Sequence, residues 1–338
     1  MASAPLKARR SAAGAVRSVR RTTVKLSRVT QSFGFPWRAP TVPRGLQVPR
    51  EPKKVGADFD TDWARRTPAR VARAAIVEGP LRLAMKALAD PEREGLDRLQ
   101  DLLRATDDDG DPPPVIFAAN HHSHLDAPMM ITAVPEPWRR KLVVAAAADY
   151  FFSTRVTGTA SALALGAFPI DRSRVNRRSA DLAQSLLEEG WSLLIFPEGG
   201  RSPDGWGQPF RGGAAFLSVR TGAPVIPVHL EGTGSILGKG MKRPKPGRTI
   251  VTFGAPLWPA DGEDARRLGD RIERAVAELG DEALTDWYSA RLRAGRGETP
   301  SLTGPSATGW RRAWALGQRR ARGRAGQRRR QQRRWPSL

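Results

Sequence analysis

Residues 115–126 read Val-Ile-Phe-Ala-Ala-Asn-His-His-Ser-His-Leu-Asp, an apolar run followed by three of the chain's four histidines and a carboxylate. The apolar run at residues 115–119 predicts a short buried strand. Asp126 and the residues after it, with Pro128 in the first turn, predict the start of a helix. The polar residues in between therefore lie on a strand-to-helix turn, which is where open α/β sheets place their ligands.

Strands and helices alternate along the chain after this turn. Predicted strands cover residues 141–146, 167–170, 193–196, 225–230 and 249–253, and predicted helices cover residues 150–165, 176–189, 214–220 and 263–279. A further helix is predicted at residues 95–104. Such alternation is typical of an α/β domain, so we expect a central, mostly parallel or mixed sheet flanked by helices.

The charge distribution divides the chain into segments. Residues 1–54 contain 13 Lys and Arg against one acid, and residues 291–338 contain 14 Arg against one acid, whereas the whole chain carries +22. We expect both segments to be disordered basic tails around a near-neutral domain at residues 95–290. Between them, residues 55–94 contain amphipathic helices that either lie on a membrane surface or pack against the domain. Gly79-Pro80 should divide the amphipathic pattern into two helices.

The composition excludes several classes of protein. The chain has no cysteine, so it has neither a disulfide framework nor a thiol nucleophile. No secretory signal pattern follows the basic N-terminal residues, and no run of 18 apolar residues is present. We therefore expect any contact with a membrane to be peripheral.

Three interpretations fit the histidine turn. In the first, Asp126 orients His121, which takes a proton from a hydroxyl group. In the second, His122, His124 and Asp126 hold a metal ion, but such a site needs further histidines and only His229 remains. In the third, Asp126 only caps the following helix. We expect no metal.

Two later turns carry charged groups that suit a phosphate. Arg172 comes directly after a predicted strand, and residues 196–202 read Phe-Pro-Glu-Gly-Gly-Arg-Ser after the next one. A guanidinium presents two parallel donors to an oxyanion, so Arg172 and Arg201 are candidate phosphate ligands. Glu198 could bind a hydroxyl or an arginine, and Gly199 permits a close approach. The alternatives are a solvated helix start at Arg172 and a structural pair of Glu198 with Arg201.

The order of these motifs resembles that of the glycerolipid acyltransferase family. The chain has N-H-x-S-x-x-D at 120–126, G-x-x-x-x-D-R at 166–172, F-P-E-G-x-R-S at 196–202, F-x-x-G at 210–213 and I-P-V at 226–228. The resemblance covers roughly residues 75–285. Gly200 stands where the family usually has Thr, and His122 and His124 stand at variable positions.

The resemblance implies an O-acyltransferase of phospholipid biosynthesis. Its donor would be an acyl thioester, either acyl-coenzyme A or acyl-carrier protein, and its acceptor a lysophospholipid, first of all 1-acylglycerol-3-phosphate, which becomes phosphatidic acid. The resemblance maps the base onto His121 and the acid that orients it onto Asp126. It assigns substrate binding to Arg172, Glu198, Gly199, Arg201, Asn120 and Ser123.

These assignments imply direct transfer without a metal or other cofactor, with backbone N–H groups near the turn stabilising the oxyanion. The expected partners are the thioester donor, an acyl-carrier protein if the donor is carrier-bound, the lipid acceptor, and an anionic membrane surface contacted by the basic tails and residues 63–88. The expected location is cytoplasmic, on the inner face of the plasma membrane. The alternatives are another polar or glycolipid acceptor and, in a different class, a protein that binds polyanions or nucleic acid, which would explain the tails but not the motifs.

Overall fold

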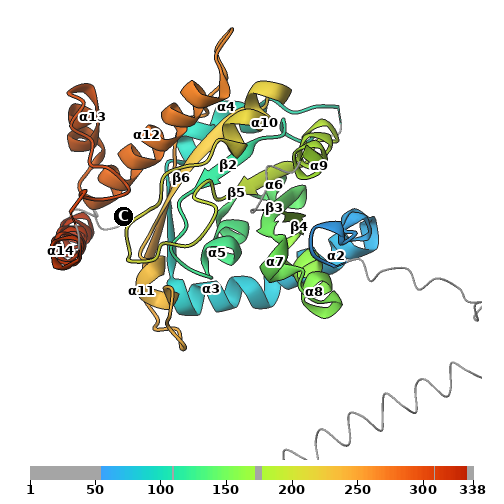
Figure 1. Ribbon diagram of the computed structural model, residues 1–338, viewed down its shortest axis with the longest axis horizontal. Helices are drawn as coiled ribbons and strands as arrows, with labels where there is room; N and C mark the ends of the chain where they lie inside the picture. The colour runs from blue at the N-terminus through green and yellow to red at the C-terminus, as the bar shows by residue number, and fades with distance from the viewer. Residues whose placement is uncertain (1–54, 109, 172–176, 308, 333–338) are drawn as a thin grey trace, which may run out of the picture. The chain divides into compact units, whose positions relative to one another are not determined.

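The computed structural model describes residues 55–108, 110–171, 177–307 and 309–332, and in this part of the chain seven strands form one sheet (Figure 1). The strands are β1 (Pro91–Glu94), β2 (Ile116–Ala119), β3 (Leu142–Ala147), β4 (Ala167–Ile170), β5 (Ser192–Ile195), β6 (Val225–Glu231) and β7 (Thr249–Phe253). Their order in the sheet is β1-β7-β6-β2-β5-β3-β4. Neighbours are parallel except for β6 and β7, which are antiparallel. The predicted mostly parallel, mixed sheet is confirmed.

The helices that accompany the sheet are α2 (Thr67–Ile76), α3 (Arg82–Ala89), α4 (Gln100–Arg104), α5 (Asp126–Ala133), α6 (Glu136–Arg140), α7 (Ala148–Phe151), α8 (Arg155–Leu165), α9 (Arg177–Glu188), α10 (Gly213–Thr221), α11 (Thr233–Leu237), α12 (Ala265–Leu284), α13 (Trp287–Gly295) and α14 (Trp310–Gln332). Short helical turns are η1 (Gly56–Asp58), η2 (Asp62–Arg65), η3 (Val77–Leu81) and η4 (Leu96–Leu99).

Helices cover both faces of the sheet because successive side chains of a strand point to opposite sides. Phe117 and Ala119 of β2 pack in one core cluster with residues of α3 and α5. Ile116 and Ala118 pack in a second cluster with residues of α9, α10 and α12. Figure 1 shows the two groups of helices on the two sides of the sheet. β2 is therefore buried on both faces, which explains its unbroken apolar sequence.

The chain does not break at Gly79-Pro80, where the sequence predicts an interruption. α2 and α3 are joined by η3, a wide π-type turn that contains Pro80, and the residues at both of its ends keep right-handed helical dihedral angles. A π-type turn accommodates the missing N–H group of a proline within one helical path.

The helical path from α2 to α3 buries one of its faces. Val77, Met85 and Ala89 are buried in the core that α5 shares, whereas Val71 is 65% and Leu83 is 68% exposed. The predicted packing against the domain therefore applies to one face, and the other face is open to a partner.

The C-terminal segment differs from the predicted disordered tail. α13 and α14 are helical, and α14 contacts α12. Trp206 donates a hydrogen bond from Nε1 to the carbonyl oxygen of Arg312 at 3.2 Å, and buried Leu302 accepts one from the N–H of Gly207. The prediction missed these contacts because Trp and Leu are sparse among the arginines. Residues 1–54 and 333–338, also predicted to be disordered, lie outside the described residues.

Two further elements differ from the sequence prediction. Residues 96–104 form η4 followed by α4 instead of one helix, and β1 was not expected at all because its sequence, Pro-Glu-Arg-Glu, is polar. Across the described ranges, none of the helices is both long enough and apolar enough to cross a membrane.

Candidate active site

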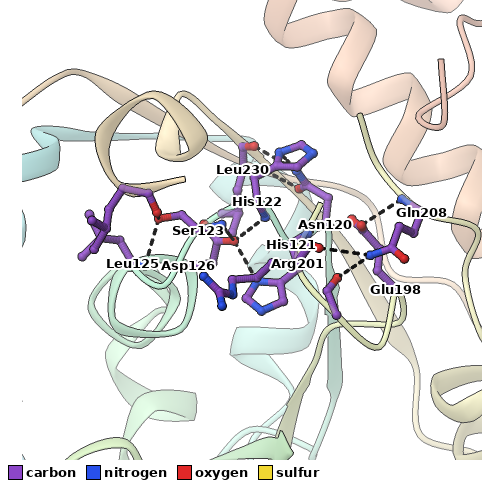
Figure 2. A network of polar contacts seen from close by, with 12 residues as sticks. Asn120, His121, His122, Ser123, Leu125, Asp126, Glu198, Arg201, Gln208 and Leu230 are labelled. Atoms are coloured by element: carbon purple, nitrogen blue, oxygen red, sulfur yellow. Dashed lines mark hydrogen bonds and ion pairs between the residues drawn. The ribbon is translucent and has the colours of Figure 1, made fainter. Parts of the chain in front are cut away.

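The histidine turn lies at the carboxyl end of β2, and residues 196–202 lie at the carboxyl end of β5. The two strands are neighbours and run parallel, so the loops that follow them leave the same edge of the sheet. This topology brings together two motifs that are about 75 residues apart in the sequence. Figure 2 shows the polar contacts that join them.

Asp126 organises the histidine turn through a single oxygen atom. Its Oδ2 accepts hydrogen bonds from Nδ1 of His121 at 2.8 Å, from the N–H of His122 at 2.6 Å and from the N–H of Ser123 at 2.8 Å. The side chain of Asp126 is fully buried, whereas that of His121 is 20% exposed. Because Nδ1 donates to the carboxylate, Nε2 of the neutral His121 ring keeps its lone pair and is the atom that can take a proton.

The capping interpretation of Asp126 does not match this geometry. A capping side chain accepts from N–H groups one to three residues after it, and the two N–H groups that Asp126 binds precede it in the chain. The carboxylate therefore folds the turn back onto His121, and the His121–Asp126 pair that the sequence predicts is formed.

Glu198 binds backbone N–H groups with both of its oxygens. Oε1 accepts from the N–H of His121 at 2.8 Å and Oε2 accepts from the N–H of Gln208 at 2.9 Å, and Glu198 is 2% exposed. Burial raises the pKa of Glu198 from 4.5 to about 7, against the lowering effect of these two hydrogen bonds. Glu198 thus holds the backbone of His121 in place, and its role in substrate binding stays a prediction. Neither an ion pair nor a hydrogen bond joins its side chain to Arg201 within the described ranges, so the predicted alternative of a structural pair is not formed either.

Gly199 allows the loop to pass close to another arginine. It has a φ of +68°, and a Cβ atom there would lie 2.8 Å from Nε of Arg211. Gln208, which the sequence analysis did not single out, donates from Nε2 to the carbonyl oxygens of Gly200 and Arg201. A glutamine in a loop carries no sequence signal for such a role. Gly199 has a structural role in the loop, and its contact with substrate stays a prediction.

Arg201 is the charged group of this loop that is placed to meet a substrate. Its half-buried side chain extends toward His121 and Asp126 (Figure 2), and among the described residues no side chain forms an ion pair with it. The pKa of His124 is lowered by partial burial and then by the charge of Arg201, so the two side chains are near each other. The predicted phosphate ligand therefore lies beside the predicted base.

Asn120 and Ser123, predicted to bind substrate, are instead used inside the protein. Asn120, which is 1% exposed, donates to the carbonyl oxygen of Leu230 at 3.0 Å and accepts from its N–H at 2.6 Å. Ser123, which has no exposed surface, donates from Oγ to the carbonyl oxygen of Leu237 at 2.8 Å. These contacts attach the turn to β6 and α11, and they remove Ser123 as a candidate nucleophile.

His122, His124 and Asp126, the three possible metal ligands, contact different partners. His124 stacks on Tyr150 with ring centroids 5.9 Å apart, whereas His122 contacts Asn120 and Asp126 contacts His121. Across the ranges that the structure describes, no group of three or more His, Asp and Glu side chains could hold a metal ion.

Three other observations complete the site. The His121 ring stacks on Phe196 at 4.3 Å, a contact that the sequence does not reveal although Phe196 lies within a recognised motif. The first N–H groups of the turn are bound to Glu198 and Asp126, so they are not free to stabilise an oxyanion as predicted. Arg172, a predicted phosphate ligand, lies outside the described residues.

Comparisons with known proteins agree with this assembly of motifs. The family model described as Acyltransferase matches residues 94–231. The chain is 30% identical over 200 residues to 1-acyl-sn-glycerol-3-phosphate acyltransferase alpha of Ovis aries, covering 56% of this chain and 63% of the relative. It is 37% identical over 94 residues to a chloroplastic 1-acyl-sn-glycerol-3-phosphate acyltransferase of Brassica napus, covering 28% of this chain and 26% of the relative.

A crystal structure of the 1-acyl-sn-glycerophosphate (LPA) acyltransferase PlsC from Thermotoga maritima is also similar, with a TM-score of 0.45 and 23% identity over 65% of this chain and 83% of the other. This likeness is too weak to support an inference about function. The chain spans less than two thirds of the length of the curated relatives named above. The match to the Acyltransferase family model includes the histidine turn and the loop after β5.

Proposed function

We propose that this protein transfers a fatty acyl group from an acyl thioester to the free hydroxyl of a lysophospholipid, with 1-acylglycerol-3-phosphate as acceptor and phosphatidic acid as product. The observation that carries the proposal is the 2.8 Å hydrogen bond between Nδ1 of His121 and Oδ2 of Asp126, formed at the carboxyl end of a parallel strand within the family region. The relatives whose names specify this acceptor support the choice of substrate.

His121 acts as the general base in the proposed reaction. Its Nε2 takes the proton of the acceptor hydroxyl, whose oxygen attacks the carbonyl carbon of the thioester. The carbon–sulfur bond then breaks, and the protonated imidazole returns the proton to the departing thiolate. Asp126 remains ionised and stabilises the imidazolium between these two steps. The chain supplies no thiol for a covalent intermediate, and its buried Ser123 is bound to Leu237, which favours direct transfer.

Arg201 binds the phosphate of the acceptor in this proposal. Its guanidinium lies on the side of the turn where the His121 ring is exposed (Figure 2), and it can present two donors to a phosphate oxygen pair. Arg172 remains a proposed second phosphate ligand on the strength of its sequence position. Acyl-coenzyme A and acyl-carrier protein both fit as donors, and no cofactor takes part.

We also propose that the protein works at an anionic membrane surface. The exposed apolar side chains Val71, Leu83, Tyr150 and Val156 belong to α2, α3, α7 and α8, and exposed Arg82 and Lys86 accompany them. Apolar side chains next to cations are the composition of an interfacial surface. The cytoplasmic face of the plasma membrane is the proposed location.

The transfer reaction is tested with purified protein, labelled acyl-coenzyme A or acyl-carrier protein, and a panel of lysophospholipids and glycolipids. Formation of labelled phosphatidic acid from 1-acylglycerol-3-phosphate, and its loss in His121→Ala, is the expected result. Labelled product from a different acceptor would identify that lipid as the substrate. Equal amounts of labelled product from the native protein and from His121→Ala would overturn the proposal.

A further inference from the structure

A pocket of about 270 Å³ has His122 of the histidine turn, and not His121, in its lining. Its lining includes His122 from the turn, Asp204 from the loop after β5, Glu231 at the end of β6, Lys239 after α11, and Arg319 from α14. Small-molecule sites commonly measure roughly 300–1,000 Å³, so this pocket suits a small ligand. α14 lies outside the region that matches the family.

The hydrogen bonds of Asn120 determine the tautomer of His122. Asn120 accepts from the N–H of Leu230, which identifies its other atom as the amide nitrogen that donates to Leu230 and approaches Nδ1 of His122 at 3.2 Å. Nδ1 must then accept, and the proton of the neutral ring is on Nε2. Burial lowers the pKa of His122 to about 4, so the ring is neutral at physiological pH.

Within the part of the chain that the structure describes, the Nε2–H group of His122 is a buried donor without a partner. A buried donor without an acceptor costs about 1–3 kcal/mol, and such groups in native proteins usually have a reason to exist. His122 lines the pocket and its Nε2 is buried in the pocket wall, so an oxygen atom of a ligand can satisfy this donor once the ring rotates slightly toward the pocket.

Two cations in the pocket form no ion pair with a carboxylate of the described residues. Arg319 packs over the ring of Trp206 with its guanidinium carbon 5.3 Å from the centroid, and its charge acts on His122 and His229. Neither Arg319 nor Lys239 forms an ion pair within the ranges that the structure describes. By contrast, both acids of the pocket have partners: Asp204 binds Arg312 at 2.9 Å, and Glu231 lies 3.3 Å from Nε2 of His229.

Among the described residues, the pocket thus offers a ligand two cations, Arg319 and Lys239, and the N–H donor of His122. The carboxylate of Glu231 lies next to them and retains its charge. Glu231 stays ionised because its hydrogen bond to His229 and nearby positive charge hold its pKa at about 2. A ligand with an anionic group of several oxygens and a neighbouring hydroxyl would match this set, with the hydroxyl donating to Glu231.

We infer that this pocket is a second binding site, separate from the His121 site, for a phosphate monoester that carries a hydroxyl group. Arg319 and Lys239 bind the phosphate oxygens, and the His122 Nε2–H donates to one of them. Figure 2 shows the His122 ring next to Leu230 and the His121 ring beside Arg201, on the two sides of the turn. The site does not depend on the proposed transfer reaction, because its residues do not include His121 or Arg201.

Binding of inorganic phosphate and glycerol 3-phosphate to the full-length protein, measured by isothermal titration calorimetry, tests the inference. The measurement is made in Arg201→Gln, which removes the proposed acceptor site. Arg319→Gln is expected to weaken binding at least about tenfold, because the variant loses a charge-assisted hydrogen bond to the phosphate. Arg311→Gln removes the same charge from an exposed position on the same helix and should leave the affinity unchanged.

The outcomes of the calorimetry separate this site from general attraction to a basic protein. Equal affinities in Arg319→Gln and Arg311→Gln would overturn the inference, and so would the loss of all saturable binding in Arg201→Gln alone. Arg319→Lys, which keeps the charge, should restore part of the affinity, and His122→Phe should weaken it severalfold while the protein remains folded by circular dichroism.

A phosphate monoester can be a soluble compound or the headgroup of a lipid, and a second comparison identifies the source. Vesicles of phosphatidylcholine with and without 1-acylglycerol-3-phosphate, a lipid that has both a phosphate monoester and a free hydroxyl, are added to the same variants. A larger effect of Arg319→Gln than of Arg311→Gln on vesicle binding assigns the site to a lipid headgroup, and a larger effect on glycerol 3-phosphate alone assigns it to a soluble ester. Equal effects of both substitutions in both comparisons contradict the site.

Discussion

Asp126 accepts three hydrogen bonds on one oxygen, one from the His121 ring and two from backbone N–H groups. Its substitution should therefore affect both turnover and stability. An asparagine side chain turned to keep its oxygen toward the two backbone donors can still hold the turn, but it no longer provides the negative charge that stabilises the His121 imidazolium. Asp126→Asn is therefore expected to reduce turnover strongly and to lower the free energy of unfolding as well, because Asp126 is fully buried.

His121→Ala should remove the base without disturbing the fold, since its ring is partly exposed. A general base contributes about 10²- to 10⁴-fold to a rate, so kcat should fall by that factor. Asp126→Asn in the His121→Ala background should add little to the loss of rate, because the two residues act as a unit. Near-normal turnover of His121→Ala in the acyl transfer assay would show that the base has been assigned wrongly.

Arg201→Gln should weaken binding of the acceptor and leave binding of the thioester donor unchanged. Removal of the guanidinium should raise KM for 1-acylglycerol-3-phosphate by at least about tenfold, the loss expected for a charge-assisted phosphate contact, and leave KM for the thioester nearly unchanged. Steady-state kinetics with each substrate varied in turn measure the two constants. The exposed Arg311→Gln variant is the control for charge, and a similar rise of both KM values in Arg201→Gln would point to a general defect.

Glu198 gives the protein a specific pH dependence of stability. Its pKa is raised from 4.5 in the unfolded chain to about 7 in the folded one, mainly by burial, so the folded state binds the proton more tightly. The stability that results is complete below about pH 4.5 and is lost as the pH rises toward about 7. The full loss is on the order of 3 kcal/mol.

Urea unfolding at pH 5 and pH 8 should show this loss in the native protein. Glu198→Gln cannot titrate and should flatten this part of the pH profile, while its amide nitrogen leaves one of the two backbone N–H groups without an acceptor. An unchanged pH profile in Glu198→Gln would assign the titration to another group.

The sequence predicted the identities of the charged residues at the site better than their partners. His121 and Asp126 were predicted as a pair because their spacing on a strand-to-helix turn allows contact, and the structure places them 2.8 Å apart. Glu198 was predicted to face the substrate, but the backbone N–H groups of His121 and Gln208 occupy its oxygens. A sequence motif shows which side chains reach a turn, whereas competition from backbone donors depends on the path of the loop.

At the scale of elements, apolar periodicity predicted the interior and missed the edges. The prediction of a helix from Leu268, Ile272, Val276 and Leu279 is confirmed by α12, where all four are buried. α12 continues to Leu284, five residues beyond the predicted end at residue 279. Gly280 within it leaves room for His229, whose Cε1 would lie 2.9 Å from a Cβ atom there. β1 was missed because an edge strand with four polar residues has no apolar pattern.

α14 was missed for a related reason, since its docking rests on a few contacts. Trp206 is the centre of them: it is 6% exposed, lies against Gly304, donates to the carbonyl oxygen of Arg312 and carries Arg319 over its ring. These partners come from a segment about 100 residues later in the chain, and local sequence patterns do not reveal such contacts.

Trp206→Ala should therefore destabilise the protein by about 3–5 kcal/mol, the range for removing a large buried aromatic side chain. Trp310→Ala provides the matched control, because Trp310 belongs to α14 and is 73% exposed, and it should change the stability by less than about 0.5 kcal/mol. Urea unfolding curves of the two variants give both values. Equal, small changes would mean that α14 does not depend on Trp206 for its attachment.

At the scale of the whole molecule, the net charge and the proposed interfacial surface belong to different segments. Residues 1–54 and 291–338 together carry +25, so the whole net charge of +22 comes from them and the residues between them sum to −3. The exposed apolar side chains of the proposed interfacial surface are on α2, α3, α7 and α8. Electrostatic attraction to a membrane is screened by salt, whereas burial of apolar side chains in the interface is not. The two contributions can therefore be measured separately.

The full-length protein should sediment with anionic vesicles but not with neutral ones, because each engaged Lys or Arg contributes about 1 kcal/mol at an anionic surface. High salt should release only part of it, since insertion of Val71 and Leu83 adds about 1.5–3 kcal/mol for each side chain. The double variant Val71→Ser, Leu83→Ser should be released completely by the same salt concentration. Its control is Val219→Ser, Leu292→Ser, which removes exposed side chains of the same two types from α10 and α13 and should behave like the native protein. Complete release of the native protein by salt would assign attachment to the basic segments alone and leave α2 and α3 as packing elements of the domain.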